Sequence, residues 1–163
     1  MQIITSSDNR HLKLARKLKQ HKFRQRENRF LLEGKVPVKE ALSKHGDLVE
    51  TIFVTARQAD WLARQPHDAT GAWQIDEREM VRLCDTTTPQ GVIAVVRHPG
   101  YDLAAIMSEP GLLLYLEEIG DPGNVGSIIR SAQAMEVGAV LLSPGCADAF
   151  SSKVIRSSMG SMA

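Results

Sequence analysis

Residues 120–138 constrain the fold more than any other stretch, because they join a tight polar turn to a helical pattern. The D-P-G-N turn at 121–124 favours a sharp bend, since proline presets φ, glycine tolerates positive φ, and Asp and Asn bond nearby backbone. Residues 125–137 then repeat apolar side chains at close to the helical period. Apolar runs at 112–116 and 139–142 flank this stretch. The order predicts strand, loop, helix and strand, which is one β-α-β unit.

Two polar residues of this unit are candidates for binding. Asn124 is expected at the mouth of the helix and Arg130 about a turn and a half further in, with Gly138 as the helix stop. The arrangement suits a polar or anionic ligand, but an ordinary α/β crossover with a glycine-rich turn has the same shape. Neither G-x-G-x-x-G nor a Gly-Lys-Ser/Thr ending is present, so the common nucleotide-binding signatures are excluded.

The turn and helix resemble the first motif of the SpoU/TrmH family of RNA ribose 2′-O-methyltransferases, roughly D-P-x-N-x-G-x-I-x-R-[ST]-A. The matching positions are Asp121, Pro122, Asn124, Gly126, Ile128, Arg130, Ser131 and Ala132. A second family segment, Lys-x-x-Arg-x-Ser-x-Gly, is matched by Lys153, Arg156, Ser158 and Gly160, in a helix expected over Ser151–Gly160 and capped by Ser151 or Ser152.

The resemblance implies a catalytic role for Arg130. Because a guanidinium rarely loses its proton, we favour a charged Arg130 that grips a phosphate and stabilises the developing alkoxide over a general base. Asn124 is then expected to orient Arg130 or the ribose, with a role as turn-former only as the alternative. Arg156 is expected to contact RNA phosphate or a partner subunit, while Ser158 and Gly160 allow close helix packing.

The resemblance also implies S-adenosylmethionine (AdoMet) as the methyl donor, held by a deep trefoil knot. The Gly-x-Glu and Ser-Leu-Asn motifs of that knot are expected beyond Ala163, so no cofactor-binding residue is assigned here. The expectation is that this chain is a fragment that cannot methylate alone. The longer parent is expected to form a homodimer. Self-association of the fragment through the apolar face of the 125–137 helix is expected only if the missing segment would cover that face, and its oligomeric state is otherwise left open.

The N-terminal region is strongly basic between residues 10 and 29, where nine cations face a single acid, Glu27. A surface helix usually mixes charges, so we interpret this face as a contact surface for an RNA backbone, with a plain solvated helix as the alternative. Its predicted RNA-binding residues are Arg10, Lys13, Arg16, Lys17, Lys22, Arg24, Arg26 and Arg29. His11, His21 and Phe23 lie among them and are candidates for base stacking, with ordinary surface or packing roles as the alternative. Candidate N-caps for the helix precede it at 5–8.

The rest of the N-terminal half alternates short apolar runs with helical stretches. Strands are expected at 30–33, 51–54, 73–75 and 91–96, and helices at 36–44, 59–64 and 77–84. This alternation predicts an α/β sandwich with a largely parallel sheet. It resembles the L30e/L7Ae-like substrate-binding domain that often precedes SpoU methyltransferases.

Proline and glycine pairs at 99–100 and 110–111 flank a short helix expected at 102–107. The predicted organisation is therefore an RNA substrate-binding domain at 1–98, a linker at 99–110, and the N-terminal part of a SpoU-type α/β-knot domain at 111–163.

Charge, cysteines and hydropathy narrow the function further. Residues 1–98 hold 17 Lys/Arg against 12 Asp/Glu, a charge of +5, whereas residues 99–163 hold 3 against 7, a charge of −4. Cys84 and Cys146 lie far apart, so we expect a reduced, cytoplasmic protein without a metal site. No apolar run is long enough to span a membrane, and no signal sequence opens the chain.

The sequence thus predicts AdoMet-dependent 2′-O-methylation of structured RNA by the full-length parent, with 23S ribosomal RNA favoured over transfer RNA. An RNA-binding module without methyltransferase activity is the alternative. A small α/β protein unrelated to RNA is a third possibility, which treats the motif matches as accidental.

Overall fold

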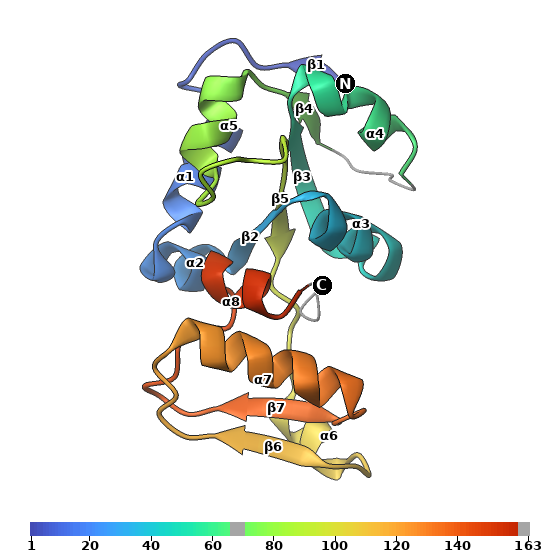
Figure 1. The fold of residues 1–163 in the computed structure, drawn as a ribbon, viewed down its shortest axis with the longest axis vertical. Helices are drawn as coiled ribbons and strands as arrows, with labels where there is room; N and C mark the ends of the chain where they lie inside the picture. Colours follow the sequence, from blue (N-terminus) through green and yellow to red (C-terminus); the bar gives the residue numbers. More distant parts are fainter. Residues whose placement is uncertain (66–70, 160–163) are drawn as a thin grey trace. The chain divides into compact units, whose positions relative to one another are not determined.

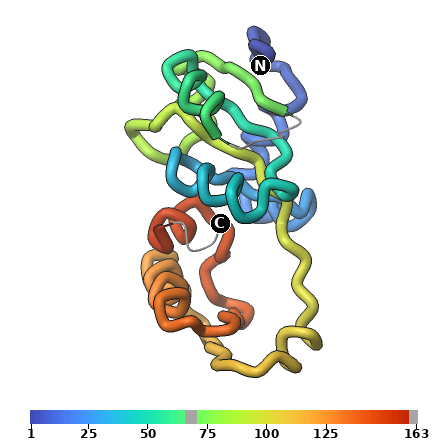
Figure 2. Tube along the Cα trace, turned by 90° about the vertical axis from the view of Figure 1, so that its right-hand side faces the viewer, coloured from blue at the N-terminus to red at the C-terminus, as the bar shows by residue number. Residues whose placement is uncertain are grey.

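The computed structural model describes residues 1–65 and 71–159, and it divides the chain into two compact units. The first unit is Met1–His98 and the second begins at Pro99. Figure 1 shows the helices and strands of both units, and Figure 2 shows the extended yellow segment in which one unit passes into the other. Each unit is described by itself.

The first unit is built on a five-stranded sheet with the order β1-β4-β3-β5-β2 (Figure 1). Its strands are β1 (Gln2–Ile3), β2 (Arg29–Glu33), β3 (Val49–Val54), β4 (Ala72–Gln74) and β5 (Val92–Arg97). Strands β1 and β3 run parallel to β4, whereas β5 is antiparallel to both β3 and β2. The expected strands are present, but the expectation of a largely parallel sheet is wrong.

The direction of β5 follows from the connection that leads into it. Helix α5 (Glu77–Leu83) runs back from the end of β4, and a strand entered directly from it would be parallel to β4. Residues 84–91 instead carry the chain back along the sheet before β5 begins (Figure 1). The return reverses the strand, so β5 pairs antiparallel between β3 and β2.

Helices cover both faces of this sheet, which confirms the α/β class (Figure 1). Helices α1 (Arg10–Leu18) and α5 lie on one face, where Leu12 and Met80 pack with Phe53 and Ile93 in a buried cluster. On the other side lie α3 (Lys35–Lys44) and α4 (Ala59–Ala63). Helix α2 (His21–Glu27) and two short 3-10 turns, η1 (Gly46–Leu48) and η2 (Ala56–Gln58), complete the unit.

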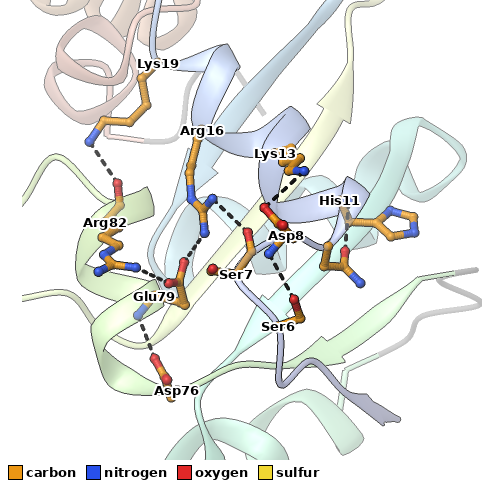
Figure 3. A network of polar contacts seen from close by, with 11 residues as sticks. Ser6, Ser7, Asp8, His11, Lys13, Arg16, Lys19, Asp76, Glu79 and Arg82 are labelled. Atoms are coloured by element: carbon orange, nitrogen blue, oxygen red, sulfur yellow. Dashed lines mark hydrogen bonds and ion pairs between the residues drawn. The ribbon is translucent and has the colours of Figure 1, made fainter.

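An ion network fixes α1 against α5. The guanidinium of Arg16 donates to the carboxylate of Glu79, which also accepts from Arg82, and Arg16 donates to the carbonyl of Ser7 as well (Figure 3). Glu79 is 9% exposed, so this pairing is shielded from solvent. Asn9, rather than a residue of 5–8, caps α1, because its side chain accepts a hydrogen bond from the backbone of His11 at 2.8 Å.

The second unit contains the predicted β-α-β arrangement. Strands β6 (Leu113–Leu116) and β7 (Ala139–Leu142) pair in parallel, joined by helix α7 (Pro122–Ala134). Helix α6 (Leu103–Ser108) precedes β6 and is capped by Asp102. Helix α8 (Ser152–Ser157) follows β7 and is capped by Ser151, as expected, while the predicted helix end at Gly160 lies outside the described residues.

Helix α7 differs from the prediction at both ends. It begins at Pro122, so the D-P-G-N segment forms its first turn, because the carboxylate of Asp121 accepts from the backbone of Asn124 at 2.8 Å and acts as the cap. It ends at Ala134. Two residues later, Glu136 takes the left-handed conformation (φ 55°) that was expected for Gly138 as the helix stop. Gly138 instead donates its backbone N–H to Leu112 as β7 begins.

The apolar face of α7 is buried within the unit. Val125, Ile129 and Val154 of α8 form its core, with Val140 and Leu142 of β7 packed against them. The condition for self-association through this face is therefore not met, because α8 and β7 cover it. Exposed apolar side chains lie elsewhere in the unit, notably Leu112 (66% exposed) and Tyr115 (59% exposed). Within the described residues, no helix is both long and apolar enough to cross a membrane.

Candidate active site and RNA-binding surface

Helix α7 carries both predicted catalytic residues, on different sides. Asn124 lies in the first turn with its side chain exposed, and Arg130 follows six residues later, also exposed. At 100° and 1.5 Å per residue, the two are about 120° apart around the axis and about 9 Å apart along it. Side chains three or four residues apart meet on a helix, whereas those six apart do not. The geometry thus places Asn124 and Arg130 on separate flanks of one helix.

Arg130 lies beside the second motif segment. Its Nη1 is 2.9 Å from Sδ of Met159, which directly follows helix α8. Arg156 lies on α8, three residues before Met159, and its side chain is exposed. The structure therefore brings the arginine of the first motif next to the helix that carries the arginine of the second.

Close packing of α7 on α8 makes this possible. A Cβ at Gly126 would overlap Cβ of Ser157 and lie 2.7 Å from the carbonyl oxygen of Val154, so only glycine fits there. Ser158 is fully buried, and its hydroxyl donates to the carbonyl of Ile155 at 2.9 Å. Its observed position agrees with the predicted packing role.

The positive charges of the second unit are confined to two helices. Its three cations, Arg130, Lys153 and Arg156, all lie on α7 and α8. Two of the unit's seven carboxylates, Glu117 and Glu118, are adjacent and exposed where β6 ends. Glu118 has a left-handed backbone (φ 53°), and its N–H donates to the hydroxyl of Ser143 after β7 at 2.9 Å. Left-handed non-glycine residues are uncommon and cluster at functional sites.

On the first unit, three of the predicted RNA-binding arginines make internal contacts. Arg16 pairs with Glu79, and Arg24 donates to the carbonyls that end α1, at 2.8 Å from Leu18. Arg29 makes a two-point contact with Glu50, at 2.5 and 3.0 Å, and this hydrogen bonding raises the pKa of the guanidinium. Each of these arginines therefore has a contact within the protein that accounts for its position without RNA binding.

The other five predicted cations of this unit are exposed. Arg10 and Lys13 lie on α1, where Lys13 pairs with Asp8 at 3.1 Å. Lys17, Lys22 and Arg26 gather around the ring of Phe23. Arg26 also hydrogen-bonds Glu27, which lowers the pKa of that carboxyl group. The exposed cations thus form two groups, along α1 and around Phe23.

Three features of the site escaped the sequence reasoning. These are the contact of Gly126 with α8, the left-handed Glu118, and the cations that surround Phe23. A glycine inside a helical pattern is a signal for close packing, so Gly126 was within reach of prediction. The other two depend on backbone conformation and on contacts between helices, which no local pattern indicates.

Comparison with known proteins identifies both units. Residues 9–94 match the family described as MRM3-like substrate binding domain, and residues 111–163 match the SpoU rRNA Methylase family. The chain thus has an MRM3-like substrate binding domain followed by a SpoU methylase family domain. It is 37% identical over 164 residues to the 23S rRNA (guanosine(2553)-2′-O)-methyltransferase RlmP of Bacillus subtilis, covering 99% of this chain and 62% of RlmP. It is 33% identical to the mitochondrial rRNA methyltransferase 3 of Xenopus laevis, covering 94% of this chain and 38% of that protein.

Solved structures of SpoU relatives share the fold. The AdoMet-bound rRNA methyltransferase from Sinorhizobium meliloti superposes with a TM-score of 0.82 at 28% identity, over 99% of this chain and 61% of that one. The SpoU methyltransferase AviRb from Streptomyces viridochromogenes, in complex with AdoMet, gives 0.77 at 27%, over 94% and 60%. This chain thus spans less than two thirds of the length of these relatives.

Proposed function

We propose that the full-length parent of this chain methylates the 2′-hydroxyl of a ribose in ribosomal RNA, with 23S rRNA as the favoured substrate. The observation that carries this proposal is the position of Arg130, an exposed guanidinium beside α8 and its Arg156. Two arginines on adjacent helices suit an RNA phosphate next to the reacting ribose. The names of RlmP and of rRNA methyltransferase 3 support the same reaction.

Arg130 acts as the catalytic residue in this proposal, and it remains charged. Methyl transfer to a hydroxyl is a displacement in which the attacking oxygen gains negative charge as it loses its proton. A guanidinium stabilises that charge without giving up its own proton, and it holds the neighbouring phosphate in place.

Asn124 positions the ribose rather than Arg130. The two side chains leave α7 on different flanks, so a substrate lying across the helix contacts both, whereas a direct bond between them is disfavoured. The side-chain amide of Asn124 is exposed and offers both a donor and an acceptor to ribose hydroxyls.

AdoMet is the proposed methyl donor, as in the titles of the two solved relatives. Its sulfonium and ammonium groups outweigh its carboxylate, so it carries net positive charge. The exposed carboxylates of Glu117 and Glu118, at the carboxyl end of β6, suit a cation of this kind. When bound, the cofactor supplies an electrophilic methyl group. The residues of this chain orient the hydroxyl and stabilise its charge.

The first unit binds the RNA in this proposal, through the cations of α1 and α2 with Arg156 of the second unit as a further phosphate contact. It comprises residues 1–98, with 99–110 as the connection to the methylase unit at 111–163. Cytoplasmic location and a homodimeric state complete the proposal, both by analogy with the family.

The test is methyl transfer from radiolabelled AdoMet to a 23S rRNA transcript by the full-length parent carrying Arg130→Ala. We expect turnover to fall by about 100-fold or more, as when one group that stabilises transition-state charge is removed, while RNA affinity changes by less than about 2-fold. Gln133→Ala, at an exposed position on the same helix, is the matched control. Near-normal turnover in Arg130→Ala would remove that residue from its role. RNA binding without AdoMet binding or methyl transfer by the unsubstituted full-length parent would favour a binding module instead.

A further inference from the structure

Helix α2 contributes no buried side chain to the first unit. Its sequence, HKFRQRE, is polar except for Phe23, which is only partly buried. A short helix that is polar on all sides gains little from packing on a core, so the core does not explain why an aromatic residue lies there. Phe23 is therefore a large apolar ring held near the surface.

Three cations surround this ring. The Nζ atoms of Lys17 and Lys22 lie 5.8 and 5.0 Å from its centroid, and the guanidinium carbon of Arg26 lies 4.8 Å from it. Lys17 comes from α1, and the other two flank Phe23 on α2. These distances are typical of cation–π contacts, which are weak at exposed sites.

The two lysines differ from the neighbouring cations in their partners. Arg16, Lys19 and Arg29 each pair with a carboxylate, of Glu79, Asp85 and Glu50 respectively. Within the residues that the structure describes, neither Lys17 nor Lys22 forms an ion pair. Their charges lie near the ring, and Lys17 also interacts with the carboxylate of Glu27, whose pKa it helps to lower.

We propose that Phe23 is a stacking platform for one unpaired RNA base, with Lys17, Lys22 and Arg26 binding the phosphates on either side. This inference rests on the proposed function, because it locates the RNA contact on the first unit. On binding, the long cationic side chains exchange the ring for phosphate oxygens, and the freed ring face receives the base. The exchange is favourable, because base–aromatic stacking and counterion release together exceed the weak cation–π contacts and the largely exposed ion pair of Arg26 with Glu27.

The chemistry selects single-stranded or looped RNA over a duplex. Bases in an A-form helix are stacked on one another, and their faces are closed to a side chain, whereas bases in loops and single strands can be splayed out onto an aromatic ring. Phosphate contacts alone would bind both forms. A preference for unpaired RNA over duplex RNA therefore distinguishes binding through the Phe23 ring from binding through phosphate contacts alone.

The experiment compares the binding of a fluorescent 12-nucleotide single-stranded RNA with that of a 12-base-pair RNA duplex to the whole chain. Phe23→Leu keeps an apolar side chain and removes the aromatic face. We expect it to weaken single-strand binding by about 10-fold while duplex binding changes by less than about 2-fold. Phe23→Trp, which enlarges the face, should keep or strengthen single-strand binding.

Salt dependence tests the cations separately. For single strands, each phosphate contact contributes about 0.7 to the slope of log affinity against log salt. Lys17→Gln and Lys22→Gln should each reduce the slope by about that amount, whereas Phe23→Leu should leave it unchanged. Lys44→Gln, at an exposed position at the end of α3, is the matched control and should behave like the unsubstituted protein.

The outcomes separate this inference from the proposed function. Undiminished single-strand binding by Phe23→Leu, or an equal loss for both RNAs, would overturn the stacking platform while leaving RNA binding by the first unit intact. Failure of the unsubstituted protein to bind either RNA in a salt-dependent manner would overturn the RNA-binding role of that unit, and the platform with it.

Discussion

His11 is a histidine on the basic helix whose surroundings disfavour its charged form. Its ring lies 5.0 Å from that of Trp73 with a 35° tilt, and its Nε2 accepts a hydrogen bond from Arg10 at 3.2 Å. Burial, and to a lesser degree the charge of Arg10, lower the pKa of His11 below its ordinary value of 6.5. The folded protein thus holds a neutral imidazole more readily than the unfolded chain does.

This shift predicts a pH dependence of stability. Because the unfolded chain binds the proton more tightly, the contribution of His11 to the free energy of unfolding is present above pH 6.5 and falls as the pH drops below that value. Urea unfolding at pH 7.5 and 5.5 measures the difference, which His11→Gln should reduce by a few tenths of a kcal/mol, because the group is only partly buried. His45→Gln, at an exposed position, is the control. An unchanged difference in His11→Gln would contradict the prediction.

At the scale of elements, the contact between α7 and α8 depends on Gly126. Alanine there would overlap Ser157 and crowd the backbone of Val154 and Ser158, so one helix must move. Overpacking of this kind costs about 1–3 kcal/mol. We expect Gly126→Ala to destabilise the second unit by that amount, measured by hydrogen exchange of α7 and α8 in the whole chain. Ser127→Ala, at the next and exposed position, should show no such loss. Equal protection from hydrogen exchange in both variants would show that α7 and α8 can accommodate the added methyl group.

Much of the fold follows from local pattern, and the rest depends on long-range geometry. Apolar runs such as Thr51–Val54 and periodic stretches such as Glu77–Leu83 have the expected structure, because alternation and helical period are local properties. The direction of β5 is not local, since it depends on where residues 84–91 carry the chain. The start of α7 was misplaced because Asp121 caps a helix as readily as it opens a turn.

The candidate site shows the same division. Motif spacing located Arg130 and Arg156, and the structure adds that α7 and α8 are adjacent. The group around Phe23 could not be predicted from spacing, because it depends on the break in the helix between Leu18 and His21, which brings Lys17 of α1 to the ring of α2. Resemblance to a family suggested the proposed chemistry, which is methyl transfer to RNA. Only the three-dimensional structure distinguished the arginines that have internal partners from the cations near the surface.

At the scale of the whole molecule, positive and negative charge are concentrated in different parts of the chain. The net charge of +1 conceals +5 on residues 1–98 and −4 on residues 99–163. A nearly neutral protein gains little attraction to RNA from its net charge, so binding depends on how the cations are distributed. The basic unit then suits the polyanionic substrate, while the acidic unit suits a cationic cofactor and keeps its few cations on α7 and α8.

The second unit also exposes apolar surface that its own elements do not cover. Helix α7 packs on the face of the sheet that carries Val140 and Leu142, so alternation places Leu113, Tyr115 and Leu141 on the opposite face. Tyr115 is 59% exposed there, and adjacent Leu112 is 66% exposed. Contiguous apolar surface of this kind binds hydrophobic dyes.

We therefore expect the chain to enhance the fluorescence of anilinonaphthalene sulfonate, and Tyr115→Lys to reduce that enhancement by about half. The substitution places a charge in the middle of the exposed face, and at so exposed a position it should change the free energy of unfolding by less than about 0.5 kcal/mol. Met135→Lys is the matched control, because Met135 is 76% exposed but caps the end of α7 and is not part of the sheet. Equal dye binding by both variants would show that the outer face of the sheet is not the apolar surface that the dye detects.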